Sequence, residues 1–152
     1  MTARNGGGGA RKNLGHVMVV EDDALIAVAL EGALLEAGAK SVRICSTTDE
    51  ALAALRDHKP DSLVLDVHLA DRADGWAIAE LVNSVGPKPP RIVFATGSPQ
   101  DIPADIAELG PVLEKPYAHA ELIEALRSPP RAGLFKRIRN ALGGDQAVGP
   151  LA

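Results

Sequence analysis

Short apolar runs alternate along this chain with segments whose apolar residues recur at helical spacing, and this order permits few folds. The apolar runs that predict strands are 17–20, 42–45, 62–69, 91–96 and 111–114. The segments that predict helices are 23–37, 48–59, 76–85 and 118–127, and 98–110 leaves room for only a short one because it holds Pro99 and Pro103. Strand–helix units repeated about five times predict an α/β fold, with a doubly wound five-stranded parallel sheet, helices on both faces and a shortened fourth helix.

The composition indicates one water-soluble domain. A chain of 152 residues with 46% apolar and 24% charged residues resembles an average globular protein. A net charge of −4 and only 3% aromatic residues do not favour nucleic-acid binding. No run approaches the roughly 18 apolar residues of a membrane span, and the N-terminus lacks the apolar core of a secretory signal. We therefore expect a cytoplasmic setting, with the single cysteine, Cys45, buried as a small core residue.

Three parts are expected along the chain. Residues 1–14 are rich in glycine and predict a flexible arm, and 15–128 hold the folded domain. Residues 129–152 form a tail with a short, basic amphipathic segment at 134–142. These 24 residues are too few to form a DNA-binding fold. This segment is compatible with docking on the domain, contact with a partner or membrane surface, or disorder. We favour a solvated or weakly docked tail, because its three basic residues supply only about 1 kcal/mol each toward a membrane.

Three carboxylates directly follow the first predicted strand, as Glu21, Asp22 and Asp23. Charges that meet at a strand end repel each other and resist desolvation, so folding alone does not explain them. Asp23 occupies the position of a helix N-cap. The carboxyl end of a parallel strand is also where α/β proteins bind ligands, which makes Glu21 and Asp22 candidates for a site.

The ends of the third, fourth and fifth strands would deliver Asp66, Thr96 and Lys115 to the same edge of the sheet. Clustered carboxylates suit a hard divalent ion such as Mg²⁺. A single aspartate on a central strand can act as a nucleophile toward phosphorus. A hydroxyl and an ammonium group nearby can bind phosphoryl oxygens and offset their charge.

These residues closely resemble the response-regulator receiver domain of bacterial two-component signalling, over about residues 14–128. The resemblance rests on Val-Val-Glu-Asp-Asp, Leu-Val-Leu-Asp-Val-His-Leu, Ala-Thr-Gly and Glu-Lys-Pro, which occur in the order of the family and at about its spacing. It implies a flavodoxin-like sheet with strand order 2-1-3-4-5.

The resemblance also implies a role for each candidate residue in phosphorylation. Asp66 would take a phosphoryl group from a histidine kinase or histidine phosphotransferase. Thr96 would bond to that group and signal its presence, and Lys115 would pair with its oxygens.

For the metal, the resemblance implies that Asp66 and Asp22 ligate Mg²⁺ directly and that Glu21 acts through water. The backbone carbonyl of His68 would complete the protein ligands. The side chains of His68 and Ser98 would flank the mouth of the site, where they influence hydrolysis of the acyl phosphate.

Two features depart from the common receiver pattern. Many receivers carry Tyr or Phe three residues before the conserved lysine, as a ring that rotates inward on phosphorylation, and this chain has Val112 there. The sequence Phe-Ala-Thr-Gly at 94–97, followed by the Pro-interrupted segment, looks like a receiver subgroup with a remodelled fourth helix. Dimerisation through a regular fourth helix is therefore not expected.

The sequence thus predicts a stand-alone receiver that acts through protein–protein contacts or as a phosphate relay or sink, and whose only chemistry is its own phosphorylation and dephosphorylation. Val112 leaves open a docking module that works without phosphorylation. A phosphatase with an aspartate nucleophile is the minor alternative. Such enzymes usually carry a second aspartate two residues after the nucleophile, where this chain has His68. We expect neither nucleic-acid binding nor stable membrane insertion.

Overall fold

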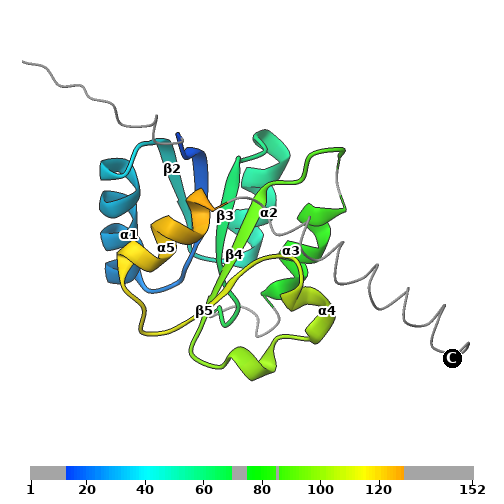
Figure 1. The fold of residues 1–152 in the computed structure, drawn as a ribbon. Helices are drawn as coiled ribbons and strands as arrows, with labels where there is room; N and C mark the ends of the chain where they lie inside the picture. The colour runs from blue at the N-terminus through cyan, green and yellow to red at the C-terminus, as the bar shows by residue number, and fades with distance from the viewer. Residues whose placement is uncertain (1–12, 70–74, 85, 129–152) are drawn as a thin grey trace, which may run out of the picture.

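Five parallel strands form one sheet in the computed structural model of the protein, in the order β2-β1-β3-β4-β5 (Figure 1). The structure describes residues 13–69, 75–84 and 86–128. The strands are β1 (Gly15–Val20), β2 (Ala39–Cys45), β3 (Ser62–Asp66), β4 (Arg91–Thr96) and β5 (Val112–Glu114). Both the predicted fold class and the predicted strand order are confirmed.

Helices cover both faces of this sheet (Figure 1). They are α1 (Ala24–Glu36), α2 (Thr48–Asp57), α3 (Trp76–Asn83), α4 (Ala104–Ala107) and α5 (His119–Arg127), with a 3₁₀ turn, η1 (Pro99–Asp101), before α4. Helices α1 and α5 pack on one face, and α2 and α3 pack on the other. Within the described ranges, no helix is long and apolar enough to cross a membrane.

The alternation of side chains along each buried strand divides the core in two. In β1, Met18 and Val20 point to the layer of α2 and α3, whereas Val17 and Val19 point to the layer of α1 and α5. All four are at most 2% exposed. A strand buried on both faces requires a continuous apolar run, which is why β1, β3 and β4 could be recognised from the sequence.

Some predicted element boundaries were wrong. Strand β3 ends at Asp66 rather than at residue 69, because the chain turns there and the His68 amide donates to the Asp66 side chain. Strand β2 begins at Ala39, because Ala39 and Ser41 pair with Gly15 and His16 of β1 before the apolar run, with a register irregularity between them. Helix α3 ends at Asn83 rather than at residue 85. The short fourth helix is confirmed, with only four residues in α4.

Helix α1 exposes much of its apolar surface. Its buried residues are Ala27, Leu30 and Leu34, which face the sheet, whereas Leu25 is 84% exposed and Leu35 is 47% exposed. Helical spacing correctly predicted the element, but it did not show that leucines lie on the outward face as well.

The predicted arm and tail fall mostly outside the described residues. Leu14, the last residue of the predicted arm, is 5% exposed and packs in the core beside α1 and α5. Cys45 is buried as expected, at 2% exposed.

The cap of α1 gives a first test. The Asp23 carboxylate accepts hydrogen bonds from the backbone amides of Leu25 (2.9 Å) and Ile26 (3.1 Å). Replacing Asp23 with Ala should lower the free energy of unfolding by about 1 kcal/mol, measured by urea denaturation with a chelator present. The matched control is Asp22→Ala, which removes an exposed acid outside the cap and should leave stability unchanged or raised. Equal destabilisation by both substitutions would contradict the assignment of Asp23 as the cap.

Candidate functional site

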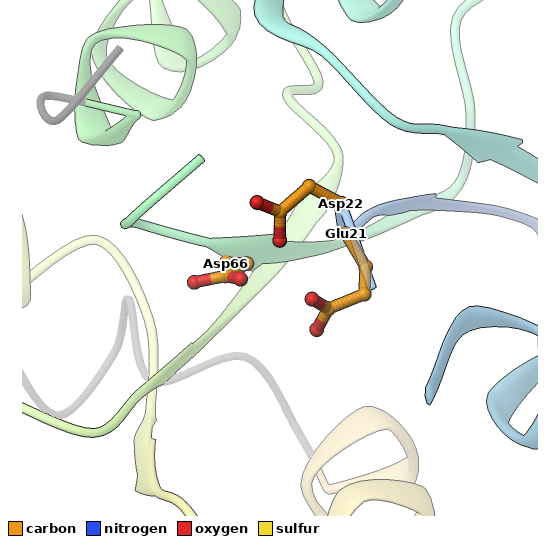
Figure 2. Close-up of side chains that lie close together, drawn as sticks. All are labelled: Glu21, Asp22 and Asp66. Atoms are coloured by element: carbon orange, nitrogen blue, oxygen red, sulfur yellow. The ribbon is translucent and has the colours of Figure 1, made fainter. Parts of the chain in front are cut away.

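Three carboxylates meet at the carboxyl edge of the sheet, between β1 and β3. Glu21 and Asp22 directly follow β1, and Asp66 is the last residue of β3. One oxygen from each lies within 4.8 Å of the others (Figure 2). Strand order reverses at β1, so this edge is the topological switch point at which α/β sheets bind ligands. The structure therefore brings together the acids that the sequence predicted to meet.

Two of these carboxylates are withdrawn from water. Glu21 is 3% and Asp66 5% exposed, whereas Asp22 is exposed. Burial raises the pKa of Glu21 to about 7, although a hydrogen bond from Lys115 and one from the Asp23 amide act in the opposite direction. A carboxyl group with such a pKa binds a proton more readily than an exposed glutamate does. The negative charge of the buried carboxylates is therefore only partly compensated, and the pocket favours binding of a cation.

Lys115 reaches this pocket from the end of β5. Its Nζ lies 3.0 Å from Glu21 Oε1 and 3.2 Å from Asp66 Oδ2. Partial burial favours the neutral amine, but the bonds and charges of Glu21 and Asp66 outweigh it, so the pKa of Lys115 is raised and the side chain stays an ammonium ion. One cation does not balance three carboxylates. This imbalance, in an all-oxygen donor set, fits a divalent ion such as Mg²⁺.

The turn after β3 holds the Asp66 carboxylate in place. Asp66 Oδ1 accepts a hydrogen bond of 3.0 Å from the backbone amide of His68. The Nε2 atom of the His68 ring lies 3.3 Å from Asp101 Oδ2 in η1. Sequence reasoning missed this pair, because its partners lie 33 positions apart and neither belongs to a motif that requires the other.

Gly75 is a second feature that the sequence did not single out. A Cβ atom at this position would lie 2.9 Å from the Asp66 carbonyl oxygen and 3.0 Å from the Val67 carbonyl oxygen. The Gly75 amide donates to Val67 O at 3.1 Å. The chain that enters α3 is thus packed against the backbone at the end of β3, and only glycine leaves room for this approach.

Thr96 ends β4 one residue beyond Ala95, which pairs with Asp66. It is fully buried, and its Oγ1 accepts a hydrogen bond of 2.9 Å from the Ser98 amide. Its carbonyl oxygen accepts from the Lys115 amide at 2.8 Å. The loop that begins at Gly97 therefore orients the hydroxyl. If the hydroxyl exchanged this partner for another, the loop would lose a hydrogen bond.

A family model described as the response regulator receiver domain matches residues 17–127 of this chain. Sensory transduction protein LytT of Enterococcus faecalis is 35% identical over 86 residues, which are 56% of this chain and 35% of that protein. Response regulator MprA of Mycobacterium sp. is 32% identical over 115 residues, 74% of this chain and 49% of MprA. The chain thus spans at most about half the length of these relatives.

Solved structures show the same fold. A CheY-like receiver domain from Methylobacillus flagellatus is 25% identical and superposes with a TM-score of 0.64, over 72% of this chain and 93% of its own. A response regulator from Burkholderia pseudomallei, solved with a phosphorylated aspartic acid, a calcium ion and citrate, is 22% identical with a TM-score of 0.63. It covers 82% of this chain and 72% of its own. The receiver domain of PhyR from Erythrobacter litoralis is 23% identical, with a TM-score of 0.65 over 79% of this chain and 89% of its own.

The raised pKa of Glu21 predicts a characteristic pH dependence of stability in the metal-free protein. The pKa is about 7 in the folded state against 4.5 for an unperturbed glutamate, so between these values the folded state holds a proton that the unfolded state has lost. The contribution of Glu21 to the free energy of unfolding is therefore largest below pH 4.5, and it is lost as the pH rises to about 7.

Urea denaturation with a chelator, over a pH series, measures this effect. The variant Glu21→Gln cannot titrate, so its stability relative to the native protein should rise across the same pH interval and level off above it. Parallel pH profiles for the two proteins would show that Glu21 is not desolvated in the folded state.

Proposed function

The chain belongs to the response-regulator receiver family, and we propose that it accepts a phosphoryl group on Asp66 in a two-component phosphorelay. The observation that carries this proposal is the environment of Asp66. Its carboxylate is buried at the end of the central strand β3, lies among the acids of β1, and has the Lys115 ammonium group 3.2 Å away. A nucleophile and a cation that can neutralise phosphoryl oxygens are thus held together before any donor arrives.

In the proposed reaction a carboxylate oxygen of Asp66 attacks the phosphorus of a phosphohistidine on a histidine kinase or phosphotransferase. The new P–O bond forms as the P–N bond of the donor breaks, and the imidazole nitrogen keeps the electron pair of that bond. The product is an aspartyl phosphate. Lys115 would pair with the transferred oxygens, while the His68 amide bond to Oδ1 holds the carboxylate in orientation.

Mg²⁺ fits the acidic pocket as the cofactor of this step. The carboxylates of Asp22 and Asp66 and the backbone carbonyl of His68 would hold it, with Glu21 acting through water. Bound there, the ion would supply positive charge that offsets the phosphoryl group and the buried acids.

The signal would pass through Thr96. Phosphorylation adds roughly −1.5 to −2 units of charge next to its hydroxyl. When Thr96 bonds to the phosphoryl group, its Oγ1 turns away from the Ser98 amide, and the segment of η1 and α4 repacks. Val112 provides no aromatic ring to rotate, so this segment, similar to that of the Phe-Ala-Thr-Gly subgroup, would itself form the changing surface. The output is a protein–protein contact, or relay of the phosphate to another protein, rather than catalytic turnover.

Phosphorylation can be tested directly. Incubation with Mg²⁺ and acetyl phosphate should add the mass of one phosphoryl group, measured by intact-protein mass spectrometry, and Asp66→Asn should abolish the adduct. Asp23→Asn is the matched control, because Asp23 is a neighbouring acid that caps α1, and it should retain the adduct. A native protein that forms no adduct would favour the phosphorylation-independent docking module. Continuous hydrolysis of phosphate esters would favour the phosphatase.

The role of Thr96 predicts a separable effect. In Thr96→Ala the aspartyl phosphate should still form, because the nucleophile and Lys115 are untouched, but the change in amide chemical shifts over 97–107 on phosphorylation should be largely lost. Thr96→Ser keeps the hydroxyl and should keep those shift changes. If the alanine and serine variants respond alike, the hydroxyl does not couple the site to this segment.

A further inference from the structure

The outward face of α1 is both apolar and exposed to solvent when only the described residues are considered. Leu25 is 84% and Val28 62% exposed, and Leu35 lies further along the same side at 47%. Within α1 the only charged residues are Glu31 and Glu36. A helix that is apolar on all sides is normally covered on all sides. We define the outward face by Leu25, Val28 and Leu35. Its exposure indicates that a further segment or another protein covers it.

A groove adjoins one end of this face. It has a volume of about 570 Å³ and lies between the first turns of α1 and the segment that joins β5 to α5, with Leu25, Ile26, Lys115 and Tyr117 among its walls. Its lining is mainly apolar, so it suits a large hydrophobic side chain. Since Lys115 also contacts Glu21 and Asp66, the groove reaches the edge of the acidic pocket.

Beyond the buried Glu21, the stretch 22–36 carries four acidic residues and no Lys or Arg. The stretch 129–144 carries four basic residues, one Lys and three Arg, and no acid. Over the whole of 13–128, 19 Asp and Glu stand against nine Lys and Arg. The charge of the C-terminal tail therefore complements that of the domain, and of the surroundings of α1 in particular.

The tail also has a matching apolar pattern. Leu134, Phe135, Ile138 and Leu142 recur at the spacing of one helix face. The N-terminal arm, residues 1–12, is basic too, but apart from Met1 it holds only Gly, Ala and polar or charged residues. Only the tail offers both the charge and the large apolar side chains that this face requires.

The tail starts beside the C-terminal end of α1, whereas the groove adjoins its first turns. The Arg127 guanidinium group at the end of α5 donates to Ala37 O, just after α1, at 2.7 Å. A linker of six residues, 128–133, reaches about 20 Å at 3.3–3.6 Å per residue. A helix of 13 residues, the length of α1, also spans about 20 Å. The linker is thus long enough to place the segment 134–142 along the outward face while α5 stays in position.

We propose that the segment 134–142 of the same chain docks on the outward face of α1 and inserts an apolar side chain into the adjoining groove. The apolar stripe of the segment covers Leu25, Val28 and Leu35, while its Lys and Arg side chains lie near the acids that flank α1. Any partner that binds this face must first displace the tail.

Limited trypsin digestion of the full chain tests the proposal, because docking protects the bonds after Lys136, Arg137 and Arg139. In the double variant Leu25→Ser and Val28→Ser, cleavage at these bonds should be about five- to tenfold faster, since most of the apolar contact is lost. Both positions are exposed, so the fold should tolerate the change. Leu81→Ser is the matched control, because Leu81 is a 48% exposed leucine on α3, and it should cleave at the native rate. Equal rates in all three proteins would overturn the proposal.

Nuclear magnetic resonance tests the same contact with substitutions in the tail and a readout on the folded domain. Replacing Phe135 and Ile138 with Ser should shift the amide signals of 24–36 and 115–119, whereas replacing Ala147 and Val148 with Ser, outside the apolar stripe, should not. The absence of shifts in the first variant would overturn the proposal. So would protection from trypsin that grows with protein concentration, which indicates a second copy, or protection that requires vesicles of anionic lipid, which indicates a membrane surface.

Discussion

The contact of Lys115 with Glu21 and Asp66 is the interaction on which the organisation of this protein depends. It joins the ends of β1, β3 and β5, three strands whose positions in the chain are far apart. Two buried carboxylates without a cation would cost the fold several kcal/mol, so the pocket is stable only when strand order and register bring the ammonium group to it. The compensation is incomplete, as the raised pKa of Glu21 shows. That incomplete balance is what makes the pocket receptive to a divalent ion and to a change of charge at Asp66.

The parts that surround the pocket are less firmly held than the sheet, and this difference suits a switch. Strands β1, β3 and β4 are almost completely buried on both faces. The segment after Thr96, in contrast, consists of a single 3₁₀ turn and a helix of four residues. It is connected to the pocket through the Thr96 hydroxyl and through the pair of His68 with Asp101. A rigid sheet with a small, polar-linked segment beside it can convert a local change of charge into a change of surface.

Much of the fold and of the candidate site could be predicted from the sequence, for reasons that particular residues illustrate. The run 17–20 must be a strand buried on both faces, and the acids that follow it must then lie at the sheet edge with Asp66. Asp23 could be recognised as a cap from its position alone. The exposure of Leu25 could not be predicted, because helical spacing shows which residues share a face but not which faces are covered. The sequence also could not predict the pair of His68 with Asp101 or the close approach at Gly75, since both depend on how one loop packs against another.

By itself, the sequence determined the order of strands and helices, the two apolar layers and the set of side chains that reach one edge of the sheet. It could do so because these follow from local periodicity and from the uniform direction of parallel strands. Only the tertiary structure decided that Glu21 and Asp66 are buried while Asp22 is not, that Lys115 bridges the two buried acids, and that α1 presents leucines outward. Burial and charge balance are properties of residues distant in sequence and adjacent in space, so they exist only once the chain has folded.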